Sequence, residues 1–194
     1  DYIQDIEHSL EDSAGSKKFE LFLPHTFYPF FLADLLRKKP GTLTKAISIV
    51  DADENFWPEK TGLQVLRFTS QSSIRIFVFK DERQFNFHLS MLINHSNKYN
   101  IYAISLYNAS TVFKGLPYDF SIIGDISTSS LVATYDNDGS KYKRIRFSCD
   151  SDLISSSNDL LSAITEQSTK IESNSNIDDN FVKSIFQEMS PIKN

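Results

Sequence analysis

The sequence has little of what a disulfide, a membrane span or a secretion signal requires. Cys149 is the only cysteine in 194 residues, so an intramolecular disulfide is impossible and a reducing compartment is expected. No run of about 18 apolar residues and no signal-peptide pattern occurs. We therefore expect an intracellular protein, in the cytoplasm or the nucleus, with no membrane as partner. Because the chain begins with Asp1 and not with Met, we also expect a fragment of a larger multidomain eukaryotic protein.

The common motifs of catalysis and cofactor binding are also absent. The six glycines form neither GxGxxG nor GxxxxGK[ST], the glycine-rich loops that hold nucleotide phosphates. The GxSxG elbow of serine hydrolases does not occur. The four histidines have no zinc-ligand spacing with one another or with the cysteine; they are His8, His25, His88 and His95. We therefore predict no cofactor, no bound metal, no small-molecule substrate and no catalytic activity.

The charge balance is mildly acidic. The chain has 20 Lys and Arg against 25 Asp and Glu, a net charge of −5 and a pI of about 5.4. Domains that bind nucleic acid usually carry a basic excess, because contacts with phosphates supply much of their affinity. On bulk charge, nucleic acid is an unlikely partner. The hydrophobic share of 40%, with sixteen Phe and eight Tyr, is enough for a substantial core.

The stretch 74–107 has the densest strand pattern in the chain. After a short polar break at 81–83, Phe85, Phe87 and Leu89 alternate with polar residues, as in a strand that is buried on one face. Neighbouring strands usually pair, so we predict an antiparallel meander of three strands here. Four phenylalanines are predicted to lie in its core or in cross-strand clusters: Phe77, Phe79, Phe85 and Phe87.

Strand and helix patterns alternate unevenly along the remaining chain. Apolar runs bounded by turn residues predict strands, and capped segments with apolar residues at helical spacing predict helices. The predicted strands are 19–23, 43–50, 63–69, 120–124 and the hairpin 131–135 with 142–147. The predicted helices are 1–11, 26–39, one from Asp150 or Ser151 to about Ile171, and 180–189.

Strands crowd the middle of the chain and the clearest helices flank them, which favours an α+β fold. This order of elements is similar to that of pleckstrin-homology-like barrels. The similarity implies a mostly antiparallel sheet or partly closed barrel, with an N-terminal helix and a C-terminal capping helix. We expect an amphipathic segment and linker at 1–18, one globular domain at 19–172, and a polar linker with a short helix at 173–194.

Two carboxylates follow a predicted strand at Asp51 and Asp53. This spacing can hold Mg²⁺ together with phosphate oxygens. The segment resembles the first motif of haloacid-dehalogenase-type phosphohydrolases and the DxD motif of some glycosyltransferases, but it departs from the phosphohydrolase pattern at Glu54. The resemblance implies a Mg²⁺-dependent phosphoryl-handling enzyme as an alternative function. A solvated acidic turn is the interpretation that we favour.

The segment 141–146, KYKRIR, is the one concentrated basic stretch. On a strand, Lys141 and Lys143 share one face, and Arg144 and Arg146 share the other, where a pair can meet phosphates or an acidic partner. The alternative is an edge strand protected by charge against unwanted pairing. We predict a non-catalytic protein–protein interaction domain, a scaffold or adaptor, that binds an acidic protein surface through these four residues. An anionic-ligand or phosphoinositide module that uses Lys143, Arg144 and Arg146 is the other alternative.

Overall fold

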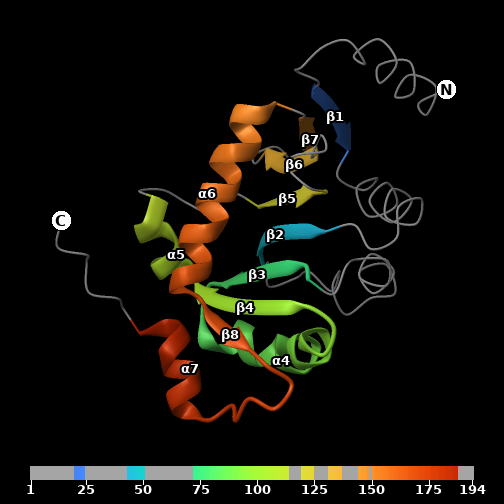
Figure 1. Cartoon of the computed structure of the whole chain (residues 1–194). Coiled ribbons are helices and arrows are strands. Elements are labelled where there is room, and N and C mark those ends of the chain that lie inside the picture. The colour runs from blue at the N-terminus through green and yellow to red at the C-terminus, as the bar shows by residue number, and fades with distance from the viewer. Residues whose placement is uncertain are drawn as a thin grey trace.

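The computed structural model describes residues 20–24, 43–50, 72–113, 119–124, 131–136, 144–148 and 150–187. These residues form one mixed sheet of eight strands in the order β1-β7-β6-β5-β2-β3-β4-β8 (Figure 1). The strands are β1 Glu20–Pro24, β2 Thr44–Ile49, β3 Ile74–Phe79, β4 Asn100–Ser105, β5 Phe120–Ile123, β6 Leu131–Asp136, β7 Arg144–Ser148 and β8 Thr169–Ile171. The helices of the described residues are α4 Glu82–Ser96, α5 Leu106–Phe113, α6 Ser151–Gln167 and α7 Asp179–Phe186.

The sheet has a parallel part and an antiparallel part. Strands β2, β3 and β4 run parallel, and β5, β6, β7 and β1 continue the sheet from β2 with antiparallel pairing. At the other end, β8 pairs antiparallel with β4. The two outermost strands, β1 and β8, lie at opposite ends of this order, so the sheet is open. The predicted antiparallel or partly closed barrel of pleckstrin-homology type is therefore wrong.

The predicted meander is wrong because its middle strand is a helix. Residues 82–96 form α4, and Asp81 caps it by accepting a hydrogen bond of 2.8 Å from the Gln84 backbone N–H. The buried residues recur at helical spacing: Phe85, His88, Met91, Leu92 and His95. Parallel strands need a crossover connection, and α4 is the crossover between β3 and β4. Phe87 is therefore exposed, whereas Phe77, Phe79 and Phe85 are fully buried as predicted.

Several other predictions are confirmed. Strands β2 and β5 lie where the apolar runs predict them, and β6 and β7 form an antiparallel hairpin. Helix α6 begins after Asp150, whose carboxylate accepts hydrogen bonds from the N–H groups of Asp152 and Leu153. The helix ends at Gln167, earlier than predicted, because the next residues form β8 on the edge of β4. The predicted elements at 1–11, 26–39 and 63–69 lie outside the described residues, and the domain boundaries stay predictions.

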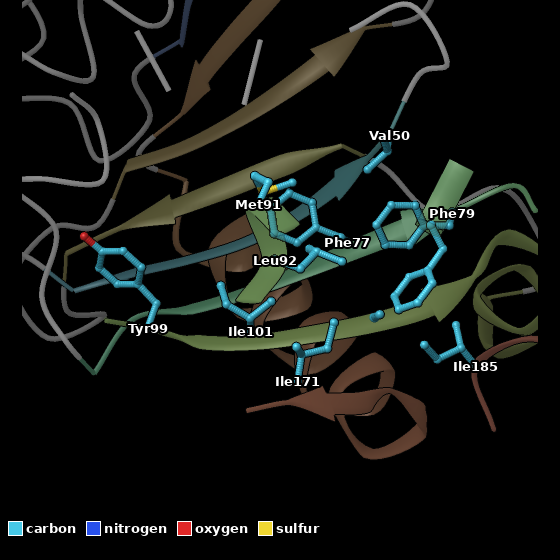
Figure 2. Packing of buried hydrophobic residues seen from close by; sticks show 11 residues of the cluster. Val50, Phe77, Phe79, Met91, Leu92, Tyr99, Ile101, Ile171 and Ile185 are labelled. Atoms are coloured by element: carbon cyan, nitrogen blue, oxygen red, sulfur yellow. The ribbon is translucent and has the colours of Figure 1, made fainter. Parts of the chain in front are cut away.

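Helices cover both faces of the sheet. Helix α6 crosses β2, β5 and β6 and packs beside α5, while α4 contacts β3, β4 and β8 (Figure 1). The side chains between α4 and the sheet, which we call the α4 face, form a cluster that includes Phe77, Phe79, Phe85, Leu92, Tyr99, Ile101 and, from α7, Ile185 (Figure 2). The opposite α6 face is built from Ile47, Ile76, Val78, Ile104, Phe120, Ile122, Ile154, Leu161 and Ile164. Among the described helices, none is long and apolar enough to cross a membrane.

Candidate functional site

The described part of the basic stretch, 144–146, lies on β7, which is an interior strand. In the backbone register, Arg144 stands opposite Asp136 on β6. Strand β1 pairs along the other side of β7. The interpretation of an edge strand protected by charge is therefore wrong. Arg144 and Arg146 occupy alternate positions about 7 Å apart on one face of the strand. Lys141 and Lys143, the other predicted site residues, lie outside the described residues.

The carboxylates of the predicted magnesium motif also lie outside the described part of the chain, at Asp51 and Asp53. Immediately before them, the Val50 N–H donates a hydrogen bond of 3.0 Å to the Val78 carbonyl, which extends the pairing of β2 with β3. Within the described residues, no group of three or more acidic, histidine or cysteine side chains is arranged to hold a metal ion.

Gln84 fixes the start of α4 to the ends of two parallel strands. Its side-chain amide donates to the Val50 carbonyl at the end of β2 and accepts from the Lys80 N–H, 2.8 Å away, just after β3. Its own backbone N–H donates to the Asp81 cap. The three bonds hold the first turn of α4 against the edge of the sheet, so the direction of the helix is set at this point.

The other end of α4 lies over a buried polar cluster. Arg75, on β3, is 6% exposed, and its guanidinium donates a hydrogen bond of 3.1 Å to the Ser48 hydroxyl on β2. His95 in the last turn of α4 is 4% exposed, and Tyr99 follows it. Burial, together with the charges of Arg75 and Lys98, lowers the pKa of His95 to about 4. Burial raises the pKa of the Tyr99 hydroxyl, and the Arg75 charge opposes this shift.

The hydrogen bonds of the two buried histidines are incomplete. Among the residues that the structure describes, neither ring nitrogen of His95 has a hydrogen-bond partner, and the same holds for Nε2 of His88. The Nδ1 atom of His88 lies 2.9 Å from the Gln84 carbonyl. Because its pKa is about 4, His95 is neutral near pH 7 and is a weak base there. We interpret His95 as part of the packing of the last turn of α4 against the sheet.

The exposed side of α4 carries residues that the strand interpretation missed. Phe87 is 67% exposed, and Tyr107 on α5, at 54%, is the other strongly exposed large apolar residue among those described. Exposed or half-exposed side chains recur every three or four positions along one line of the helix and the turn after it: Arg83, Phe87, Ser90, Asn94 and Lys98. We call this line the α4 stripe. A helical reading of 82–96 would have placed Phe87 away from Phe85, since two positions correspond to about 200°.

Negative charge is unevenly distributed along the sequence, with one excess in residues 1–12, which contain five acidic and no basic residues, and another near the C-terminal end. Residues 150–187 contain seven acidic and two basic residues, a formal charge of −5 that equals that of the whole sequence. The segment 83–98 contains Arg83 and Lys98 and no acidic residue. Charge is therefore divided between regions, and the net value describes neither the α4 stripe nor β7.

Comparison with known protein families and with curated proteins finds no match. The fold is similar to that of TrmBL2, an archaeal chromatin protein whose structure is described as showing a novel mode of DNA binding. That match has 10% identity and a TM-score of 0.50, and it covers 88% of this chain and 62% of the TrmBL2 chain. NucT from Helicobacter pylori also matches, with 10% identity, a TM-score of 0.46 and coverage of 79% and 99%. At this identity, the likeness to TrmBL2 establishes a shared fold.

Proposed function

We propose that this chain is a nucleic-acid-binding domain. The observation that carries the proposal is the basic strand β7, which has arginines at two alternate positions, Arg144 and Arg146; in the sequence, Lys141 and Lys143 come just before it. The shared fold with TrmBL2, a chromatin protein described as binding DNA, supports it. The proposal places the chain in a compartment that holds nucleic acid, the cytoplasm or the nucleus. Binding without catalysis is part of the proposal.

The expectation of a eukaryotic scaffold or adaptor with a protein partner is contradicted by the likeness to an archaeal DNA-binding protein. The same finding contradicts the expectation that nucleic acid is an unlikely partner. That expectation used the net charge of the whole chain, which includes acidic segments such as residues 150–187. The field that a phosphate meets depends on nearby charges, because charges beyond about 10 Å are largely screened at moderate salt.

Arginine suits the proposed contact for a geometric reason. A guanidinium presents N–H groups in a planar fork and can donate two hydrogen bonds to one phosphate. Alternate residues of a strand are about 7 Å apart along the backbone, a spacing at which two arginines can serve two phosphates of one strand. Contacts of this kind fix position on the backbone and carry no sequence information. We therefore expect binding that is strongly dependent on salt and weakly dependent on sequence.

Fluorescence anisotropy with labelled duplex DNA tests the proposal. The wild-type chain is expected to bind at low salt, and Arg144→Gln combined with Arg146→Gln should weaken binding. Each lost phosphate contact should reduce the slope of log K against log salt by about 0.9, so the double variant should lose about 2. Lys170→Gln with Lys183→Gln removes two exposed lysines from the acidic C-terminal region and serves as the matched control.

Two outcomes would overturn this assignment. If the wild type binds no DNA or RNA at low salt, the proposed function is wrong. If the double arginine variant keeps its fold by circular dichroism and binds with an unchanged salt slope, β7 is not the contact. The non-catalytic part of the proposal is tested by incubation of labelled DNA and RNA with the protein and Mg²⁺. The labelled DNA and RNA are expected to stay at full length. A cleavage activity that co-purifies with the protein would contradict the non-catalytic part of the proposal.

A further inference from the structure

The α4 stripe combines an exposed aromatic ring with cations and uncharged hydrogen-bonding groups. Phe87 lies between Arg83, one turn before it, and Ser90, one turn after it, and Asn94 and Lys98 continue the line. The ring of Phe87 meets the ring of His88 edge to face, with centroids 5.0 Å apart and planes at 76°. Since His88 is buried, this contact restricts the orientation of an otherwise exposed ring.

We infer that the α4 stripe binds single-stranded nucleic acid, with a base stacked on Phe87 and backbone phosphates held by Arg83 at one end of the stripe and by Lys98 at the other. The inference rests on the proposed function and names a strand type and a surface for it. Charge complementarity supports this occupant over the stripe itself, where the charged side chains are those of Arg83 and Lys98. The exposed acidic residues of this region, Asp81 and Glu82, stand at the helix start, before Arg83. Ser90 and Asn94 supply neutral hydrogen-bonding groups between the two cations.

A single strand fits the stripe better than a duplex does. In a duplex, both faces of each base are stacked on neighbouring bases, whereas an unpaired base can offer a face to an aromatic side chain. Base–aromatic stacking next to a basic track is how proteins bind single strands without strict sequence preference. The part of the stripe on α4, from Arg83 to Asn94, is about 16 Å long, and Lys98 in the following turn extends it, so the stripe is long enough for several nucleotides.

A protein partner, such as a second copy of the chain, fits the stripe less well. The cores of protein interfaces are depleted of charged residues and enriched in apolar ones. The exposed residues of α4 and of the turn after it include one apolar side chain, that of Phe87: Glu82, Arg83, Asn86, Phe87, Ser90, Asn94, Asn97 and Lys98. A single exposed ring among polar groups suits stacking on one base.

The experiment measures anisotropy of labelled oligothymidylate with the full chain. Phe87→Ala should weaken binding roughly 5- to 150-fold, the range expected for the loss of one base–aromatic stack. Phe87→Tyr, which keeps the ring, should bind like the wild type. Tyr107→Ala is the matched control, because it removes the other strongly exposed ring of the described residues, from α5, and it should leave affinity unchanged. Arg83→Gln with Lys98→Gln should lower the salt slope.

The possible failures of the two proposals can be told apart. If the wild type binds DNA through Arg144 and Arg146 while Phe87→Ala changes nothing, the α4 stripe is not the site and the proposed function stands. If Phe87→Ala and Tyr107→Ala weaken binding equally, stacking on α4 is also overturned. Sedimentation of the wild type as a dimer that Phe87→Ala dissociates would assign the stripe to a second copy instead. If no nucleic acid binds, both proposals fall.

Discussion

The two faces of the sheet differ in chemistry. The α6 face is almost purely aliphatic, with Phe120 as the one aromatic residue of its buried cluster. The α4 face gathers aromatic rings, among them Phe79 and Phe85, whose centroids lie 5.4 Å apart at 89°. It also buries a guanidinium and an imidazole, Arg75 and His95. The α6 face is therefore mainly an aliphatic support, with Ser157 as a buried polar residue of α6, whereas the stability of the α4 face depends on ring geometry and on protonation.

This difference bears on the proposed nucleic-acid surface. The α4 stripe lies on a helix that is fixed at its start by hydrogen bonds of Gln84 and that buries Met91, Leu92 and His95 toward its end. Helices hold side chains more rigidly than loops do, and a rigid site loses less entropy on binding. The predictions below compare the two faces in order of expected effect.

The largest effect is expected from the loss of a buried ring on the α4 face. Phe85→Ala removes a fully buried ring that contacts Phe79 and Phe186, and it should lower the free energy of unfolding by about 3–5 kcal/mol. Phe87→Ala, two residues away, should change it by less than about 0.5 kcal/mol. Urea titration followed by circular dichroism measures both. Equal losses in the two variants would be inconsistent with the burial described for α4.

The second-largest expected effect is a pH dependence of the free energy of unfolding that comes from His95 on the α4 face. The pKa of His95 is about 4 in the folded chain and 6.5 in the unfolded chain, so the unfolded state binds a proton first as pH falls. Stability from this group is complete above pH 6.5 and is lost as pH falls through 4, by about 3 kcal/mol in total.

The test compares the wild type with His95→Gln by urea titration at neutral and acidic pH. The variant should be less stable near pH 7 and should lose less stability on acidification, because the proton-linked term is absent. The difference between the two proteins removes the contribution of the carboxylates that both share. An identical loss of stability on acidification in both proteins would show that His95 does not resist protonation in the folded state.

The smallest effects concern the helix caps, one for each face. Asp81→Ala and Asp150→Ala each remove a side chain that accepts backbone N–H groups at the start of α4 or α6, and each should cost about 1 kcal/mol. The corresponding changes to Asn keep a hydrogen-bond acceptor and should cost less. If Asn costs as much as Ala at either cap, the charge of the carboxylate near the helix N-terminus is the larger contribution, not its hydrogen bonds.

The antiparallel part of the fold was predictable from the sequence because its signals are local. The turn residues 136–139 between two strand patterns predict the β6–β7 hairpin, and Asp150 before an amphipathic run predicts the start of α6. The parallel part depends on distant pairing, which leaves a weaker local signal. Residues 85–87 contain two phenylalanines, and this local pattern fits a strand as well as a helix. The helix cap at Asp81 is the signal that distinguishes the helix from the strand.

The candidate site was predictable in part for a similar reason. The cations at 141–146 are adjacent in the sequence, so their density is visible without a structure. The residues of the α4 stripe are spread over sixteen positions of the sequence. They can be recognised as one line only when the segment is known to be a helix. Arg75 and His95 are twenty residues apart, and their proximity depends on the packing of α4 on β3.

The two outer strands bear on how this chain avoids aggregation. An exposed strand edge offers unpaired N–H and carbonyl groups to other chains, and short edges, proline and lysine limit such pairing. The edge strand β8 is three residues long, with Lys170 at its centre, and it covers β4. At the other end, β1 finishes with Pro24, which has no N–H to donate. A chain truncated before Thr169 would present β4, NIYAIS, as a new and more apolar edge, and self-association into larger particles is the expected consequence.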